Sequence, residues 1–240
     1  MRSERFVPVM VALLIAAACC AGCGSSQAPA SSLTPGASPP PLSAGTAQPG
    51  RTVDDLLSAG QAALGAGSLS DAEAAYREAV RTNPRSAPAQ FGLGNVYVRQ
   101  GRLTEAEAAY RAAIAADPTM AAAHMNLGVV YYQLGSLSKA AEAYDAALRL
   151  QPDDAQTLYL LAAVRIQGSQ LSEAEELLNR AKAAQPDLAE VYYGLGALYK
   201  LQGKTEEAIS AFETFLSLGT AQDPAAMDAA RAELRELKGE

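Results

Sequence analysis

A spacing of 34 residues recurs through most of this chain and restricts its fold more than any other feature. Alanine and then proline recur with this spacing, at Ala72, Ala106, Ala140, Ala174 and Ala208, and at Pro84, Pro118, Pro152 and Pro186. Five segments follow one another without insertion, and we number them units 1 to 5: 53–86, 87–120, 121–154, 155–188 and 189–222. A fixed period of this length predicts a stack of supersecondary units that bury a continuous core only together.

Each unit contains signals for two helices joined by a tight turn. In four units the fifteenth position is a glycine, where a left-handed residue ends a first helix: Gly67, Gly101, Gly135 and Gly203. Three residues later, a hydroxyl side chain is expected to cap the second helix, at Ser70, Thr104, Ser138 and Ser172. In three units a glutamate follows at the spacing of a capping box: Glu73, Glu107 and Glu175. The proline near the end of the unit stops the second helix, so the chain is expected to be all-α.

The sizes of three residues in each unit also indicate how its two helices pack together. Small residues at the eighth and twentieth positions let the helices approach closely, and a large residue at the twenty-fourth position fills the space beside them. Unit 4 departs most from this pattern, because Ala162 replaces a glycine, Leu178 replaces an aromatic residue and Arg165 replaces a tyrosine. We expect the stem of Arg165 to cover the core with its guanidinium outward, and the interface of unit 4 to be the loosest.

This arrangement resembles the tetratricopeptide repeat. In unit 2 the residues that carry the resemblance are Leu93, Gly94, Tyr97, Ala106, Tyr110, Ala113 and Pro118. The resemblance covers residues 53–222, although the tryptophan usual at the fourth position is missing. It implies a right-handed α-solenoid of five helix-turn-helix units. Residues 223–240, which begin with Asp223-Pro224 and carry a narrow apolar stripe, are expected to form a terminal capping helix.

In this family the first helices line a concave surface, so the resemblance implies a groove that binds a peptide or a helix. The predicted groove residues are Phe91, Asn95, Met125, Asn126, Val129, Tyr132, Tyr159, Ile166, Tyr193 and Lys200. Since alanines follow Tyr159 and Tyr193 at one helical turn, the groove is expected to be widest there. The alternative is that individual members pack between neighbouring first helices. A carboxylate clamp of the kind found in one subfamily is not expected, because its cationic residues are absent.

The N-terminus resembles a bacterial lipoprotein signal peptide over residues 1–22. Two arginines precede an apolar run from Phe6 to Ala18, which is too short to span a membrane. All three cysteines follow at once, as Cys19, Cys20 and Cys23. Residues 20–24 resemble a lipobox, which implies lipidation of Cys23. The alternatives are lipidation of Cys19, or ordinary cleavage after Ala18.

Residues 23–52 are expected to be the lipidated cysteine and a tether. Between residues 24 and 50 no charged residue occurs, and prolines stand among Ser, Ala, Gly and Thr. Such a composition predicts a disordered segment. The expected location is therefore outside the cytoplasm, with a lipid anchor in a bacterial membrane, the outer one if the cell has two. The folded body would lie in the periplasm or outside the cell.

Composition and motifs argue against several classes of function. The net charge of −7 argues against nucleic acid binding. His124 is the only histidine, and we find no phosphate loop, no nucleophile beside a base and no metal-ligand spacing. We therefore expect no enzyme activity, cofactor, metal or small-molecule substrate. The sequence predicts a scaffold or assembly factor at the cell envelope that binds a protein or peptide and meets the membrane only through its lipid. Two alternatives are an accessory subunit that positions an envelope enzyme and a homo-oligomeric structural element.

Overall fold

The computed structural model describes residues 51–218 and 224–240, and all regular secondary structure in these residues is α-helical. The helices are α2 (Val53–Gly65), α3 (Leu69–Thr82), α4 (Ala87–Arg99), α5 (Leu103–Ala116), α6 (Ala121–Gln133), α7 (Leu137–Leu150), α8 (Ala155–Gln167), α9 (Leu171–Ala184), α10 (Ala189–Gln202), α11 (Thr205–Leu218) and α12 (Pro224–Lys238). The expected signal peptide, Cys23 and tether lie outside the described residues.

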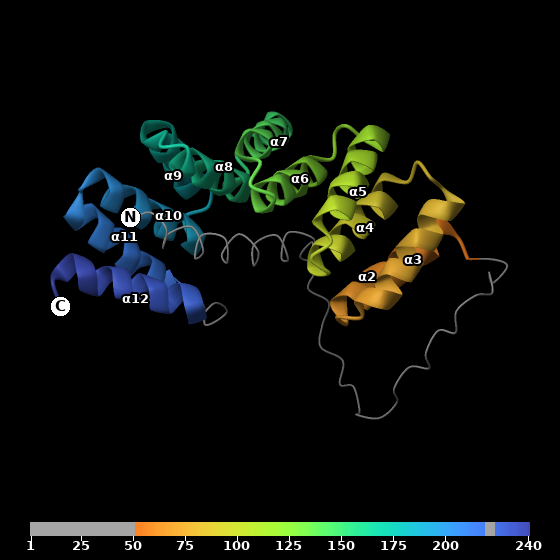
Figure 1. Ribbon diagram of the computed structural model, residues 1–240, viewed down its shortest axis with the longest axis horizontal. Helices are drawn as coiled ribbons and strands as arrows, with labels where there is room; N and C mark the ends of the chain where they lie inside the picture. The colour runs from red at the N-terminus through yellow and green to blue at the C-terminus, as the bar shows by residue number, and fades with distance from the viewer. Residues whose placement is uncertain (1–50, 219–223) are drawn as a thin grey trace, which may run out of the picture.

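The helices form five consecutive pairs that stack into a solenoid, as predicted. Each first helix packs on its own second helix, and each second helix also touches the first helix of the next unit. Neighbouring first helices meet as well, α2 with α4, α6 with α8, and α8 with α10. Figure 1 shows the pairs following an arc from α2 and α3 to α11, with α12 packed at the far end as the capping helix.

Close contact between the paired helices explains the small residues at the eighth position. A Cβ atom added to Gly94 would lie 2.4 Å from the ring of Tyr110, and one added to Gly128 would lie 2.5 Å from the ring of Tyr144. In unit 4 both partners change together, to Ala162 and Leu178, and both side chains are fully buried. Because leucine lacks a ring, it leaves room for the alanine methyl group, and the core of unit 4 is closed.

The predicted left-handed turn residues are confirmed. Gly67, Gly101, Gly135 and Gly203 have φ angles of 76°, 74°, 73° and 74°. In unit 4 the glycine comes one residue early, so Ser169 takes the left-handed conformation instead, with φ at 59°. This conformation is unfavourable for a residue with a Cβ atom.

The predicted capping boxes are wrong, because the second helices begin earlier. Their first residues are leucines, Leu69, Leu103, Leu137 and Leu171, and the residues before them form no side-chain cap hydrogen bond. These leucines come directly after the turn, and three of them, in units 2 to 4, pack against the buried core clusters. The start of the helix is therefore set by burial of a leucine rather than by a capping hydroxyl group.

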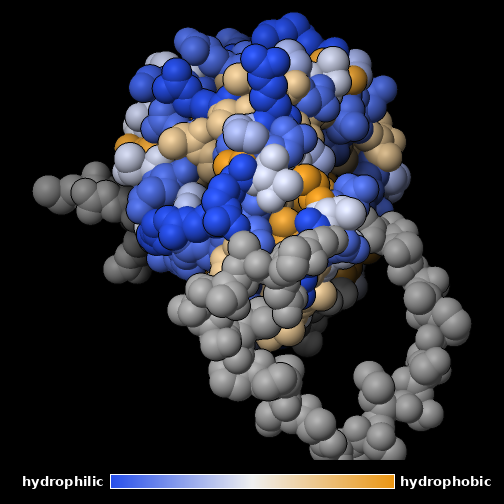
Figure 2. All heavy atoms as spheres, turned by 90° about the vertical axis from the view of Figure 1, so that its right-hand side faces the viewer, coloured by the Kyte–Doolittle hydropathy of each residue, from blue (hydrophilic) through white to orange (hydrophobic). Residues whose placement is uncertain are grey.

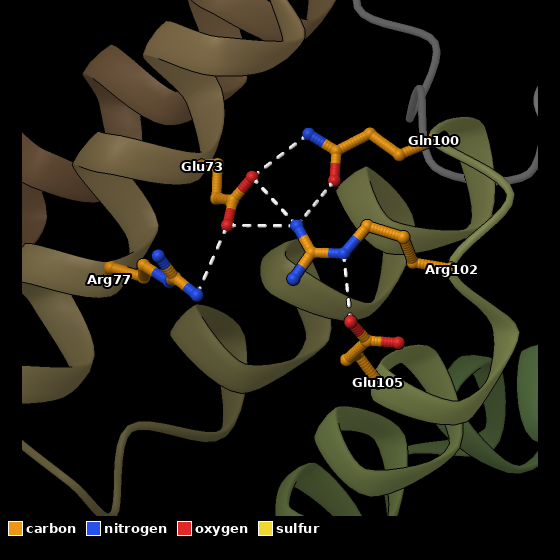
Figure 3. Close-up of polar contacts among 5 residues, drawn as sticks. All are labelled: Glu73, Arg77, Gln100, Arg102 and Glu105. Atoms are coloured by element: carbon orange, nitrogen blue, oxygen red, sulfur yellow. Dashed lines mark hydrogen bonds and ion pairs between the residues drawn. The ribbon is translucent and has the colours of Figure 1, made fainter.

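Glu73 does not take part in a capping box, and its carboxylate instead connects unit 1 to unit 2. Its carboxylate accepts hydrogen bonds from Gln100 Nε2 at 2.9 Å and from Arg102 Nη1 at 3.1 Å, and both donors come from the turn between α4 and α5. Figure 3 shows this Glu73 cluster, in which Arg102 also donates to Glu105 at 2.9 Å and Arg77 approaches Glu73 at 3.3 Å. The cluster connects a second helix to the turn of the following unit.

The same contact recurs at the corresponding place between units 4 and 5. Glu175 accepts from Gln202 Nε2 at 2.9 Å and from Lys204 Nζ at 3.4 Å. The hydrogen bond from Gln202 lowers the pKa of the Glu175 carboxyl, with a further contribution from Lys204, against the opposing effect of burial. Because this pKa is depressed in the folded state, the contact stabilises the fold at neutral pH. That contribution is lost as the pH falls through the depressed pKa.

The guanidinium of Arg165 is only partly outward, because it reaches charged groups near the surface while its Nε atom is buried and has no hydrogen-bond partner among the described residues. Its Nε atom lies 3.3 Å from Glu173, its Nη2 atom lies 3.7 Å from Asp145, and its Nη1 atom donates to Gln170 at 3.1 Å. Since both carboxylates are substantially exposed, this is a solvent-screened network that contributes little to stability.

Candidate functional site

A hollow of about 480 Å³ is lined mainly by residues of α2, α4 and α6, the first helices of units 1 to 3, where α4 and α6 do not pack closely on each other. We call it the N-terminal groove, and its lining residues are Leu57, Gln61, Leu64, Gly65, Tyr76, Pro88, Phe91, Gly92, Asn95, Val98, Arg99, Tyr110, Met120, Ala122, Asn126 and Val129. Figure 2 views the end of the array that carries α2 and α3, where apolar side chains gather near the middle of the face within a hydrophilic surround.

The chemistry of the N-terminal groove is apolar with a few amide groups. The amides are Gln61 from α2, Asn95 from α4 and Asn126 from α6. The one charged residue in the lining is Arg99, whose Nη1 atom donates to the backbone oxygen of Leu64 at 2.9 Å. Such a surface suits an uncharged segment whose backbone groups pair with the amides while its side chains contact the apolar wall.

A small polar network forms part of the lining. Tyr110 donates its hydroxyl hydrogen to Asn95 Oδ1 at 2.7 Å, and Asn126 Nδ2 donates to the same oxygen at 3.0 Å. Asn126 is only 3% exposed, and its own Oδ1 atom has no hydrogen-bond partner among the residues that the structure describes. This oxygen lies out of reach of solvent, so leaving it unpaired lowers the stability of the network.

At the corresponding place between units 3 and 4, the two amide side chains of this network are absent. Tyr144 corresponds to Tyr110 by the 34-residue period, but Val129 and Leu160 stand in place of the two asparagines. The Tyr144 hydroxyl is buried and has no hydrogen-bond partner in the described part of the chain. Burial also raises the pKa of Tyr144 well above its usual value. The polar lining is therefore specific to the interface between units 2 and 3.

This difference predicts opposite effects of two matched substitutions. Tyr144→Phe should stabilise the protein by about 1 kcal/mol, because it removes an unpaired buried hydroxyl group. Tyr110→Phe should destabilise it by about 1 kcal/mol, because Asn95 and Asn126 lose a shared partner. Urea unfolding followed by circular dichroism measures both changes. Equal losses in the two variants would mean that Tyr144 has a partner such as an ordered water.

Four of the predicted groove residues line the N-terminal groove: Phe91, Asn95, Asn126 and Val129. Four lining residues that the prediction did not select, Leu57, Gln61, Leu64 and Val98, share repeat positions with selected ones, so the 34-residue period could have found them. Pro88 and Ala122 share the second repeat position and Arg99 occupies the thirteenth, and the family resemblance places both positions on the concave surface, whereas Met120 lies in the loop before α6.

The expectation that the groove is widest near Tyr159 and Tyr193 is wrong. Both side chains are 1% exposed. The ring of Tyr159 is covered by α10, where an added Cβ atom on Gly194 would lie 3.2 Å from it. The ring of Tyr193 packs on Phe212 and Phe215 in a cluster that also includes residues of α12. These two tyrosines belong to the core, as the alternative in the sequence analysis allowed.

The other predicted groove residues also have structural partners. Met125 and Tyr132 are buried in the same core cluster as Tyr159, and Ile166 packs against that cluster from a half-buried position. Lys200 binds Glu233 and Glu236 of α12, the latter at 2.9 Å. The C-terminal half of the predicted ladder is therefore occupied by core packing and by the capping helix.

Residues 51–218 and 224–240 contain neither a grouped set of metal ligands nor a helix suited to span a membrane. No three side chains of His, Cys, Asp or Glu in these ranges are grouped so that they could hold a metal ion. Nor does any helix in the same ranges combine the length and the apolar character needed to cross a membrane.

Solved structures with the same architecture include PilW, YrrB and MamA. PilW, described as a widely conserved type IV pilus biogenesis factor, is 18% identical, with a TM-score of 0.71 over 78% of this chain and 86% of its own. YrrB, described as having an unusual peptide-binding site, is 20% identical, with a TM-score of 0.60 over 75% and 92%. MamA is 23% identical, with a TM-score of 0.61 over 66% and 93%. At these identities the likeness establishes the fold.

No curated protein sequence matches this chain significantly. Two family models, both described as tetratricopeptide repeat, do match it. One matches at residues 57–121, 97–155 and 125–189, and the other matches at residues 189–218. Together the matches run through the helix pairs that form the solenoid. This chain therefore belongs to the tetratricopeptide repeat family.

Proposed function

We propose that this protein is a non-enzymatic scaffold that binds an uncharged peptide segment of a partner protein in the N-terminal groove. The observation that carries the proposal is the hollow of about 480 Å³, which has an apolar wall and the amide side chains of Gln61 and Asn95 in its lining. Solenoids of this kind present extended surfaces to partners, and apolar side chains of a bound peptide would fill the hollow.

The names of two structural neighbours agree with this proposal. YrrB is described as a repeat protein with a peptide-binding site, and PilW as a biogenesis factor for a pilus. Both descriptions belong to those proteins. For this chain they support peptide binding and a role in assembly, and the groove residues supply the physical reason.

The proposed location rests on the sequence. The arginines and apolar run of residues 1–18, followed by three clustered cysteines, support export and lipidation at Cys23 in a bacterial membrane. The folded units would then act at the cell envelope and meet the membrane through the lipid only. Mass spectrometry of the mature N-terminus distinguishes acylated Cys23 from acylated Cys19 and from an unmodified end.

Selection of peptides from a random display library against the full chain tests the binding proposal. Val98→Glu places a charge in the wall of the groove, and Leu150→Glu places one on a side chain that is 39% exposed at the end of α7. We expect the selected peptides to be uncharged and apolar. They should bind the Val98→Glu variant at least about tenfold more weakly than the wild type, because a charge is desolvated when the groove is filled.

Leu150→Glu should bind these peptides like the wild type, and circular dichroism should show both variants folded. Equal binding of the two variants would place the partner on another surface and would contradict the proposal.

A further inference from the structure

The N-terminal groove and the chain segment just before it share an unusual chemistry. The lining holds a single charged residue, Arg99, in a protein with a net charge of −7. Residues 24–50 contain no charged residue at all, and they contain Pro29, Pro35, Pro39, Pro40, Pro41 and Pro49. An uncharged segment enters an uncharged groove without the cost of removing water from an ion.

The segment is attached within reach of the groove. Helix α2 begins at Val53, and Leu57 in the groove wall follows four residues later, or about 6 Å along the helix. Three first helices spaced by roughly 10 Å present a groove about 20 Å long. About seven residues at the polyproline rise of about 3.1 Å cross that length. Residues 43–52 are then available for the return connection.

A proline-rich segment also fits the groups that line the groove. Polyproline II segments dock on aromatic-lined grooves, and here Phe91 offers a half-buried ring beside Pro88. A polyproline II backbone makes no internal hydrogen bonds, so its carbonyl groups are free to accept from the Gln61 amide in the lining.

We infer that residues 35–42, Pro-Gly-Ala-Ser-Pro-Pro-Pro-Leu, occupy the N-terminal groove of their own chain when no partner is bound. The inference rests on the proposed function of this groove, and it adds regulation, because a partner peptide must displace the segment. Attachment through a short connection supplies an effective concentration on the order of 1 mM. Even an intrinsic dissociation constant of about 0.1 mM would therefore keep the groove mostly filled.

Displacement would also change the distance between the folded units and whatever holds the N-terminus. With residues 35–42 in the groove, only residues 24–34 remain outside it on the N-terminal side. Partner binding would free the whole of residues 24–50. The segment would thus couple occupancy of the groove to the length of the connection.

Site-specific photo-crosslinking in the full chain tests the inference. We would replace Phe91 by p-benzoylphenylalanine and, as a matched control, place the same amino acid at Leu150 on the end of α7. Trypsin releases the crosslinker on peptide 86–99 and the segment on a peptide that ends at Arg51, so their adduct is identified by fragment-ion mass spectrometry. We expect crosslinks from position 91 to residues 35–42 at a yield at least about tenfold above that from position 150.

A substitution series shows whether the prolines direct the contact. The triple change Pro39→Ser, Pro40→Ser and Pro41→Ser should lower the yield at position 91 at least about fivefold, because the preformed extended conformation is lost. The control pair Pro29→Ser and Pro49→Ser should leave the yield unchanged. Equal effects of the two sets, or crosslinks that fall mainly on residues 24–34, would overturn the inference.

Mixing isotope-labelled and unlabelled chains separates the two possible sources of the segment. If both crosslinked peptides carry the same isotope, the segment binds the groove of its own chain, as inferred. If one peptide is labelled and the other is not, a second copy supplies the segment, and the inference is contradicted. The outcome is independent of the display experiment. If library peptides bind the groove while residues 35–42 do not crosslink there, only the inference fails. If residues 35–42 crosslink there while library peptides ignore Val98→Glu, the proposed function fails.

Discussion

Replacing Tyr193 by alanine is expected to destabilise the folded protein by about 4 kcal/mol and to loosen the capping helix. The side chain is fully buried, with ring centroids 5.6 Å from Phe212 and 5.3 Å from Phe215. Truncation of a buried aromatic side chain costs about 3–5 kcal/mol through lost contacts and the cavity left behind. Ala226 and Ala230 of α12 belong to the same cluster, so the cavity opens against that helix. Urea unfolding measures the loss, and hydrogen exchange measures the mobility of α12.

Phe91→Ala is the matched control, because Phe91 stands at the same repeat position in unit 2. Its ring is half-buried in the groove wall and contacts Tyr110 at a centroid distance of 5.8 Å. We expect a loss of only about 1 kcal/mol, since less apolar area is removed from the core. Similar losses for the two variants, or a Tyr193→Ala protein as stable as the wild type, would mean that Tyr193 is not part of the core.

Introducing a methyl group at Gly128 is expected to cost about 3 kcal/mol. The added Cβ atom would lie 2.5 Å from Tyr144, a separation that real Cβ atoms do not adopt, and that ring is enclosed on all sides. Overpacking of this kind forces helices apart or rings off their rotamers. The midpoint of urea unfolding should fall accordingly, while Gly65→Ala, which meets nothing within 4 Å, should change stability by less than about 1 kcal/mol.

Unit 4 indicates which substitution at Tyr144 should compensate for Gly128→Ala. It carries Ala162 with Leu178 where unit 3 carries Gly128 with Tyr144. Combining Gly128→Ala with Tyr144→Leu should therefore cost less than the sum of the single changes, by a coupling of at least about 1.5 kcal/mol. A strictly additive double-mutant cycle would show that the paired exchange in unit 4 has another cause.

The architecture could be predicted from the sequence because its signals are local and repeated. Left-handed glycines such as Gly101, prolines such as Pro118 and the pairing of small with large residues each act within a few residues or within one helical hairpin. Since the same signals recur every 34 residues, the number of units and the start of the capping helix at Pro224 followed without knowledge of distant contacts.

Two features depended on contacts between units and were mispredicted. The second helices begin at leucines such as Leu103 because the core fixes their position, and this leaves Glu73 free to bind Gln100 and Arg102 of the next unit. The open part of the inner surface lies at Phe91 rather than at Tyr193, although both occupy the same repeat position.

Side chains at identical repeat positions differ in burial because each of them has different neighbours. The chain by itself determined five helix pairs and a cap, since hydrogen bonding and packing within a hairpin are decided by nearby residues. Only the tertiary structure decided which first helices remain uncovered. Helix α12 and Gly194 close the C-terminal half over Tyr193 and Tyr159, whereas units 1 to 3 keep an apolar hollow, because burial depends on which elements pack from outside the repeat.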